Sequence, residues 1–309
     1  MNECRVLFAG TPEFALASLS ALVDNDIRPH AVLTQPDRPA GRGKKLSASP
    51  VKRFAVDHGI DVLQPTSLKD DSVVNAITAL KPDILIVAAY GIILPQAVLD
   101  IPTHGCLNVH ASLLPRWRGA APIQAAILAG DATTGVSLMS MTAGLDCGPV
   151  FVTEAIDIGE DETAGELHDR LAALGGELLV KHLDAIIAGR LRASEQDESL
   201  ANFAGKIKPA DARLDWSLAA DLLARRVRAY NPVPGAWFKL DDERIKCWRA
   251  TSADVTGAPG EVQKASRDGV VVACGEGGLA LRKLQRPGKR PIDAGAFAAQ
   301  LEIVGKTLG

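Results

Sequence analysis

The sequence predicts an α/β protein: a mostly parallel sheet covered by helices, followed by a small β-barrel domain. Three observations lead to this fold class. In the first part of the chain, short apolar runs alternate with segments of helical periodicity, which is typical of βαβ units. Residues 210–309 instead contain several short strand-like segments separated by turn residues. At 309 residues, the chain is long enough for two domains, each with its own core.

The chain is predicted to begin with a strand, a turn and a helix. Residues 5–9 are apolar enough for a buried strand. Gly10, Thr11 and Pro12 then supply a turn, an N-cap and a proline at the first helical position, and the helix continues to about Val23. Because the G-x-G-x-x-G spacing is absent, this Rossmann-like start is not expected to bind a nicotinamide or a flavin.

The same alternation continues along the first domain. Its further strands are predicted at residues 30–34, 60–63, 83–89, 106–110, 134–141 and 149–158. Its further helices are predicted from Ser49-Pro50, at 68–80, 95–99 and 119–129, and from a capping box at Thr163 to about Gly189. The run 83–89 is apolar without alternation, as expected of a strand covered on both faces. Tyr90, which follows it, is either a core residue or a neighbour of the substrate.

The central stretch of the chain passes from a strand into a proline-punctuated loop. Residues 106–110 predict a short buried strand, and Asn108 and His110, two residues apart, point to the same side of it. The carboxyl ends of strands are where open α/β sheets bind ligands. Taken alone, His110 could still be a core histidine bonded to the backbone.

Asp146 is the third polar residue of the predicted site. It lies between Gly144 and Gly148 in a loop that joins two predicted strands. An amide can donate to a developing oxyanion, an imidazole can donate or move a proton, and a carboxylate can orient the imidazole or accept a proton. Asn108, His110 and Asp146 therefore suit acyl transfer to an amine.

Residues 35–46 are too rich in proline, glycine and charge to belong to a core. This segment is predicted to be a polar loop, and its cations include Arg38, Arg42, Lys44 and Lys45. Two interpretations stay open: an ordinary solvated loop, or a loop that contacts phosphate or nucleic acid.

The first domain is predicted to span residues 1–189, followed by a linker at 190–209 and a second domain at 210–309. The second domain should begin with a helix that passes through Arg228. Five short strands are predicted at 236–240, 244–249, 261–266, 269–274 and 278–285. Five such strands suggest a small barrel.

Composition excludes several classes of protein. No apolar run approaches the roughly 20 residues that cross a bilayer, and the amino terminus does not resemble a secretory signal, so a cytoplasmic protein is expected. The five cysteines are scattered, which predicts neither a disulfide framework nor a metal site. Residues 190–309 hold 20 Lys and Arg against 15 Asp and Glu, a net charge of +5, whereas residues 1–189 carry −8. This modest basic excess leaves two interpretations open: an ordinary solvated surface, or a surface that meets a polyanionic partner.

The polar motif resembles that of the 10-formyltetrahydrofolate-dependent formyltransferases. The matching residues are Asn108, His110, Asp146 and the run Ser112, Leu113, Leu114 and Pro115. The resemblance extends from residues 8–15 through 35–43 to 228–236. It implies that Asn108, His110 and Asp146 are catalytic and that Ser112 to Pro115 bind folate. It also implies 10-formyltetrahydrofolate as the formyl donor, without a metal.

The same resemblance implies that the acceptor is the α-amino group of initiator methionyl-tRNA. The loop with Arg38, Arg42, Lys44 and Lys45 would contact the acceptor end of the tRNA, and an OB-like second domain would bind its backbone. We expect a monomer. Our hypothesis is that the free amine attacks the formyl carbon while Asn108 and protonated His110 stabilise the oxyanion. Asp146 would hold His110 or take up the proton.

Two other functions remain open from the sequence. A sister formyltransferase acting on an amino sugar nucleotide or another small amine would share the Asn, His and Asp pattern. A non-catalytic folate- or RNA-binding module could keep the fold, although it would have no need of all three polar residues. Competition between substrates would distinguish the sister formyltransferase from an enzyme that acts on tRNA.

Overall fold

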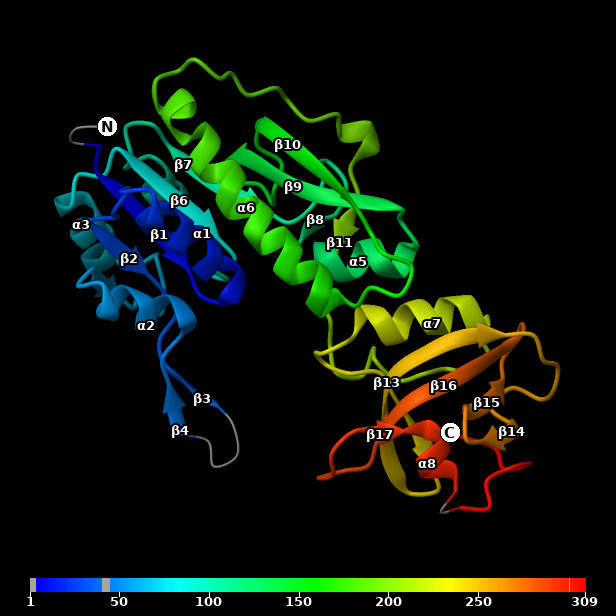
Figure 1. The fold of residues 1–309 in the computed structure, drawn as a ribbon. Coiled ribbons are helices and arrows are strands. Elements are labelled where there is room, and N and C mark those ends of the chain that lie inside the picture. Colours follow the sequence, from blue (N-terminus) through cyan, green and yellow to red (C-terminus); the bar gives the residue numbers. More distant parts are fainter. Residues whose placement is uncertain (1–3, 41–44, 300) are drawn as a thin grey trace. The chain divides into compact units, whose positions relative to one another are not determined.

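A computed structural model of the protein describes residues 4–40, 45–299 and 301–309 (Figure 1). The chain forms two compact units. The first unit comprises Met1–Pro122, Thr134–Ile156 and His168–Ala204, and the second comprises Ile123–Thr133, Asp157–Leu167 and Gly205–Gly309. The predicted domain boundaries at 189 and 210 stay a prediction.

The first unit is built on a seven-stranded sheet in the order β10-β9-β7-β6-β1-β2-β5. Its strands are β1 (Val6–Gly10), β2 (Ala31–Leu33), β5 (Asp61–Leu63), β6 (Ile84–Ala88), β7 (Cys106–His110), β9 (Thr133–Ser140) and β10 (Val150–Asp157). The five strands from β5 to β7 are parallel, and β9 pairs with β7 in the antiparallel sense. This is the mostly parallel, Rossmann-like sheet that the sequence predicts.

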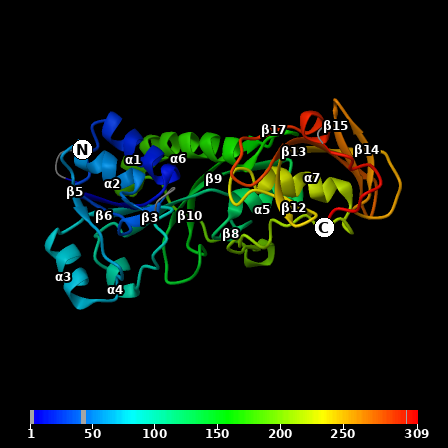
Figure 2. The same cartoon turned by 90° about the horizontal axis from the view of Figure 1, so that it is seen from below.

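Helices cover both faces of this sheet, as Figure 2 shows. They are α1 (Glu13–Asp24), α2 (Pro50–Asp57), α3 (Asp71–Ala79), α4 (Gln96–Leu99) and α6 (Ala164–Ile187). Helices α1 and α6 lie on one side, and α3 and α4 lie on the other. Leu7, Leu85 and Val98 belong to the apolar core on one of these faces. Every residue of β1 and β6 is buried, whichever face it points to, which explains why both strands are apolar without alternation.

The predicted helix starts are partly confirmed. Ser49 caps α2, since its Oγ accepts a 3.0 Å hydrogen bond from the Lys52 N–H. The capping box before α6 is also present, with a 2.9 Å bond from the Thr163 N–H to Glu166 Oε2. The predicted N-cap at Thr11 is wrong. The N-cap of α1 is Pro12, because the Thr11 hydroxyl instead donates to the Tyr90 carbonyl, 3.0 Å away.

The predicted polar loop at 35–46 was an incomplete description. Strands β3 (Arg38–Ala40) and β4 (Lys45–Ser47) pair in the antiparallel sense, so a hairpin stands there. The strand residues whose burial is described, Arg38, Pro39, Leu46 and Ser47, are all exposed, and exposed strand residues produce no hydrophobic alternation. Periodicity therefore could not reveal it. Helices α3 and α5 (Pro122–Ala129) begin at Asp71 and Pro122, rather than at 68 and 119.

The segment predicted as a linker holds local structure. It contains a 3₁₀ turn, η1 (Glu198–Leu200), and a short strand, β11 (Phe203–Ala204). Strand β11 pairs in parallel with β8 (Arg118–Gly119), which directly follows the central motif. Residues 190–204 therefore belong to the surroundings of the predicted site.

The second unit packs helix α7 (Ala220–Ala229) against an antiparallel sheet in the order β12-β13-β16-β15-β14 (Figure 1). The strands are β12 (Trp237–Leu240), β13 (Glu243–Ala253), β14 (Val262–Ser266), β15 (Gly269–Ala273) and β16 (Gly278–Gln285), with β17 (Ile292–Asp293) beside β16 and α8 (Ala294–Ala298) after it. The carboxyl-terminal segment joins the two edge strands. The Val262 N–H donates to Lys306 O, and the Gly309 N–H donates to Lys239 O, each at 2.9 Å.

Within the described residues, no helix is long and apolar enough to span a membrane. The same part of the chain contains no group of three or more His, Cys, Asp or Glu residues that could hold a metal ion.

Candidate active site

The structure brings the three predicted catalytic residues together. Asn108 and His110, at the end of β7, are buried, and the Asp146 side chain is only 15% exposed. Asn108 Nδ2 lies 3.4 Å from Asp146 Oδ1, and His110 Nδ1 lies 3.8 Å from Asp146 Oδ2. An amide and an imidazole therefore face one carboxylate.

Strand β7 presents both side chains on one face because they alternate with Val109. Val109 points to the other face and packs toward α6. A Cβ placed on Gly175 of that helix would lie 2.9 Å from Val109 Cγ1, closer than side chains normally approach. Gly175 thus allows α6 to pack directly beneath the strand that carries the site. The sequence analysis did not single out this glycine.

The hydrogen bonds of His110 assign its tautomer. His110 Nε2 lies 3.1 Å from the Trp117 carbonyl oxygen. A carbonyl can only accept, so Nε2 carries the ring hydrogen in this contact. Nδ1 is then the nitrogen that faces Asp146.

Asp146 occupies a constrained position. Its backbone is in the left-handed region, with φ of 49°, which aspartate tolerates better than most residues. The Gly119 N–H donates to Asp146 Oδ2 at 2.9 Å. The carboxylate is therefore held by a backbone donor while it faces Asn108 and His110.

The four predicted folate-binding residues form a turn directly after His110. Ser112 is fully buried, and its hydroxyl donates to the Arg116 carbonyl at 2.6 Å. The Leu114 N–H donates to Ser137 Oγ at 3.1 Å. Leu113 and Pro115 are half-buried. The Ser112 hydroxyl and the Leu114 backbone N–H are therefore already engaged in hydrogen bonds within the protein.

Of the four predicted tRNA-binding residues, the structure describes Arg38 and Lys45, which lie on the β3–β4 hairpin. Arg38 is exposed on β3, and Lys45 begins β4. Arg42 and Lys44 lie outside the described residues. The base of the hairpin is fixed by Asp37, which accepts hydrogen bonds from Lys52 at 2.8 Å and from Gln64 at 2.8 Å. These bonds lower the pKa of the Asp37 carboxyl.

Tyr90 belongs to the core. It is 2% exposed, and burial raises the pKa of its phenol to about 12. Its hydroxyl has no hydrogen-bond partner in the described part of the chain. Its carbonyl accepts bonds from Thr11 Oγ1 at 3.0 Å and Gln35 Nε2 at 2.9 Å.

Sequence reasoning missed the residues that surround the trio. Asn202 Oδ1 accepts a 2.6 Å bond from the Trp117 N–H, and Gln196 Nε2 donates to the Asp146 carbonyl at 2.9 Å. Both residues lie in a polar segment without periodicity, and no signal in the sequence distinguishes them from ordinary surface residues.

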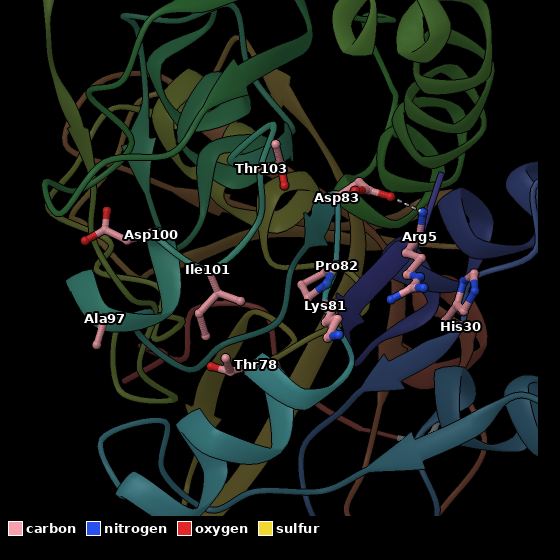
Figure 3. A pocket seen from close by; sticks show the side chains of 10 residues that line it. All are labelled: Arg5, His30, Thr78, Lys81, Pro82, Asp83, Ala97, Asp100, Ile101 and Thr103. Atoms are coloured by element: carbon pink, nitrogen blue, oxygen red, sulfur yellow. Dashed lines mark hydrogen bonds between the residues drawn. The ribbon is translucent and has the colours of Figure 1, made fainter. Parts of the chain in front are cut away.

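A hollow of the first unit has none of the three predicted catalytic residues in its lining. Its volume is about 940 Å³, and Figure 3 shows the side chains that line it. Arg5, His30 and Asp83 directly precede β1, β2 and β6, so this is the amino-terminal edge of the sheet. Asp83 uses one carboxylate oxygen to accept the Arg5 N–H at 2.6 Å. The other charged or titratable residues that line the hollow, Arg5, His30, Lys81 and Asp100, are exposed.

A second hollow of about 450 Å³ lies in the second unit. Cations and one indole line it, namely Arg228, Arg249, Lys283 and Trp248, opposite Asp161 and Glu166. Burial lowers the pKa of the Arg228 guanidinium, which donates a 3.2 Å hydrogen bond to the Glu162 carbonyl.

A buried amide, imidazole and carboxylate at the end of a parallel-sheet strand provide the types of group that acyl transfer to an amine requires. Comparison with known proteins identifies the acyl group. The Formyl transferase profile matches residues 4–183, and the profile of its C-terminal domain matches residues 206–302. The chain belongs to the formyl transferase family, as the sequence analysis expected.

Curated relatives align over nearly the whole chain. The methionyl-tRNA formyltransferase of Pseudomonas fluorescens is 52% identical over 99% of this chain and 97% of its own length. That of Aromatoleum aromaticum is 53% identical, over 95% and 93% respectively.

Solved structures support the fold. An N-formyltransferase from Helicobacter canadensis, in complex with folinic acid and dTDP-3-aminofucose, superposes with a TM-score of 0.67 over 90% of this chain and 99% of that chain, at 17% identity. HypX from Aquifex aeolicus, in complex with tetrahydrofolic acid, gives a TM-score of 0.63 over 96% of this chain and 47% of that chain, at 18% identity. At these identities the likeness shows the fold alone.

Proposed function

We propose that the protein transfers the formyl group of 10-formyltetrahydrofolate to the α-amino group of initiator methionyl-tRNA. The observation that carries this proposal is the joint presence of the assembled trio and of relatives about half identical over nearly the full chain, named methionyl-tRNA formyltransferase. The product, N-formylmethionyl-tRNA, would serve translation initiation in the cytoplasm. We propose that a single chain carries out the reaction without a metal.

In the proposed reaction, the free amine forms an N–C bond to the formyl carbon, and the C–N10 bond to the folate breaks. The proton lost by the amine is returned to the folate nitrogen. Asn108 and His110 would donate to the oxyanion of the tetrahedral intermediate. Because His110 Nε2 is directed at the Trp117 carbonyl, we assign the donor role to Nδ1, with Asp146 orienting the ring or receiving the proton.

The folate would lie against the turn from Ser112 to Pro115. Leu113 and Pro115 would supply apolar contact, because Ser112 and Leu114 direct their polar groups into the protein. Ligands of this size are typically held by apolar walls and a few polar groups.

We propose that the tRNA is bound by two basic regions. One is the hairpin with Arg38, Arg42, Lys44 and Lys45, which would meet the acceptor end. The other is the second unit, whose hollow combines three cations with the Trp248 indole. Cations contact phosphates and an aromatic ring stacks on unpaired bases, which together suit an RNA backbone.

The test is transfer of radiolabelled formyl from 10-formyltetrahydrofolate to three acceptors in parallel: methionyl initiator tRNA, free methionine and an amino sugar nucleotide. Label on the tRNA alone is the expected result. Label on the sugar nucleotide would instead support the sister activity of the structural neighbour. Binding of folate or tRNA with no transfer to any acceptor would indicate a non-catalytic module.

A further inference from the structure

One side chain of the 190–204 segment forms hydrogen bonds to two backbone carbonyls of the loop that carries Asp146. Gln196 Nε2 donates to the Asp146 carbonyl at 2.9 Å and to the Gly148 carbonyl at 2.7 Å. Both amide hydrogens are thus used on the same turn. Gln196 comes from a segment 50 residues further along the chain, so it fixes the loop from outside.

The partners of Gln196 also fix the orientation of its amide. Gln196 Oε1 lies 3.0 Å from Arg118 Nε, a group that can only donate. The two carbonyls on the other side can only accept. A flipped amide would lose all three hydrogen bonds, so the assignment of oxygen and nitrogen follows from the chemistry.

Arg118 is in turn held firmly. It is 2% exposed, and its guanidinium makes two hydrogen bonds to Glu198, at 2.9 and 2.7 Å. The next residue, Gly119, donates its N–H to the Asp146 carboxylate at 2.9 Å. Asp146 is therefore tied twice to β8: directly through its carboxylate, and through its carbonyl by way of Gln196 and Arg118.

We propose that Gln196 is a positioning residue for formyl transfer, which acts by holding Asp146 against Asn108 and His110. The inference rests on the proposed function. Asp146 stands in a left-handed backbone conformation, and its contacts to Asn108 and His110 are long, at 3.4 and 3.8 Å. A small displacement of the loop would break both contacts. Geometric errors of about 1 Å cost catalysis about 100-fold in comparable sites.

The experiment compares single-turnover formyl transfer in four proteins: wild type, Gln196→Met, Asp146→Asn and the double variant. Methionine keeps the length of the side chain and removes its hydrogen bonds. In the wild-type background, Gln196→Met should slow transfer about 10- to 100-fold. In the Asp146→Asn background it should cost less than about twofold, because a residue that acts through Asp146 has nothing left to position.

Binding and folding are measured on the same variants. The Kd for methionyl-tRNA should change by less than about twofold, since the loss concerns the chemical step. Gln196→Glu provides a second variant that retains an acceptor for Arg118 but sets a carboxylate against two carbonyls, and it should also slow transfer. Glu195→Ala, at an exposed neighbouring residue, is the matched control and should transfer at the wild-type rate.

The outcomes separate the two proposals. Equal losses in both backgrounds, or wild-type rates in Gln196→Met, would overturn the role of Gln196 while leaving the proposed function intact. A wild-type protein that transfers no formyl to any acceptor would overturn both.

Discussion

The two edges of the parallel sheet carry polar residues in different arrangements. At the amino edge, Arg5 and Asp83 border a hollow of about 940 Å³, in which Asp83 is half-buried and the other charged groups are exposed. At the end of β7, Asn108 and His110 are buried and face one carboxylate within 3.8 Å. Polar groups that are desolvated and converge can act together on one reacting atom, whereas solvated and dispersed charges act on it only weakly.

The largest effect is expected from His110→Ala. If His110 exchanges a proton or donates to the oxyanion, kcat should fall about 10²- to 10⁴-fold. The measurement is kcat under saturating donor and tRNA, with tRNA binding measured separately. Weakened binding with an unchanged kcat would move His110 out of the reaction.

Asn108→Ala should have the next largest effect. Removal of one oxyanion donor typically costs about 10²- to 10³-fold in kcat. Asn108→Asp, which keeps the size but cannot donate when ionised, should behave similarly. Activity in the aspartate variant close to wild type would mean that the Asn108 amide does not donate to the oxyanion.

Gly175→Ala tests the support beneath β7. The added methyl meets Val109 Cγ1 at 2.9 Å, and overpacking a core costs about 1–3 kcal/mol, while alanine regains about 1 kcal/mol of helix propensity. A net loss of roughly 1 kcal/mol in the free energy of unfolding is expected. Gly205→Ala is the control, because a Cβ there meets no atom within 4 Å. Stabilisation of the Gly175 variant would show that the helix does not press on the strand.

Glu198 offers a test by pH. The hydrogen bonds from Arg118 lower the pKa of this exposed carboxyl, so its contribution to stability is complete above about pH 4.5 and is lost as the pH falls through the lowered value. The Tm of Glu198→Gln at pH 7 should therefore be slightly lower than that of the wild-type protein. The difference should narrow in acid. If the two proteins still unfolded at different temperatures at low pH, the destabilisation of Glu198→Gln would not come from the loss of the Glu198 charge.

We expect the smallest effect on catalysis from substitutions at the amino-terminal edge of the sheet. Lys81→Ala and Arg5→Ala should change kcat and KM by less than about twofold, because exposed charges outside a site contribute little. A fall in kcat as large as that expected for Asn108→Ala would show that the amino-terminal edge also contributes to catalysis, and would contradict the distinction between the two edges.

The sequence predicted the sheet and the trio for clear physical reasons. Buried parallel strands such as β6 leave long apolar runs, and alternation in β7 places Asn108 and His110 on one face. Asp146 was expected in the site because it lies between two glycines in a loop that joins two strands, and the family resemblance supported this. Spacing alone does not show that a loop 36 residues after His110 returns to it.

Other features left no local signal. In the hairpin of β3 and β4, the strand residues whose burial is described are all exposed. The hydrogen bonds of Gln196 and Asn202 are made to partners 50 and 85 residues away. Long-range pairing of this kind depends on the tertiary fold and is not encoded in periodicity. Thr11 was wrongly predicted as an N-cap because its hydroxyl donates a hydrogen bond to the carbonyl of Tyr90, a residue distant in sequence.

The most direct test of the site is a single turnover of Asp146→Asn with donor and methionyl-tRNA at saturation. Asparagine preserves the shape of the side chain and an acceptor for the Gly119 N–H, but removes the charge that faces His110 Nδ1. We predict formyl transfer slowed about 10²- to 10⁴-fold with an unchanged Kd for the tRNA. A rate within twofold of wild type would contradict the assignment of catalysis to this edge of the sheet.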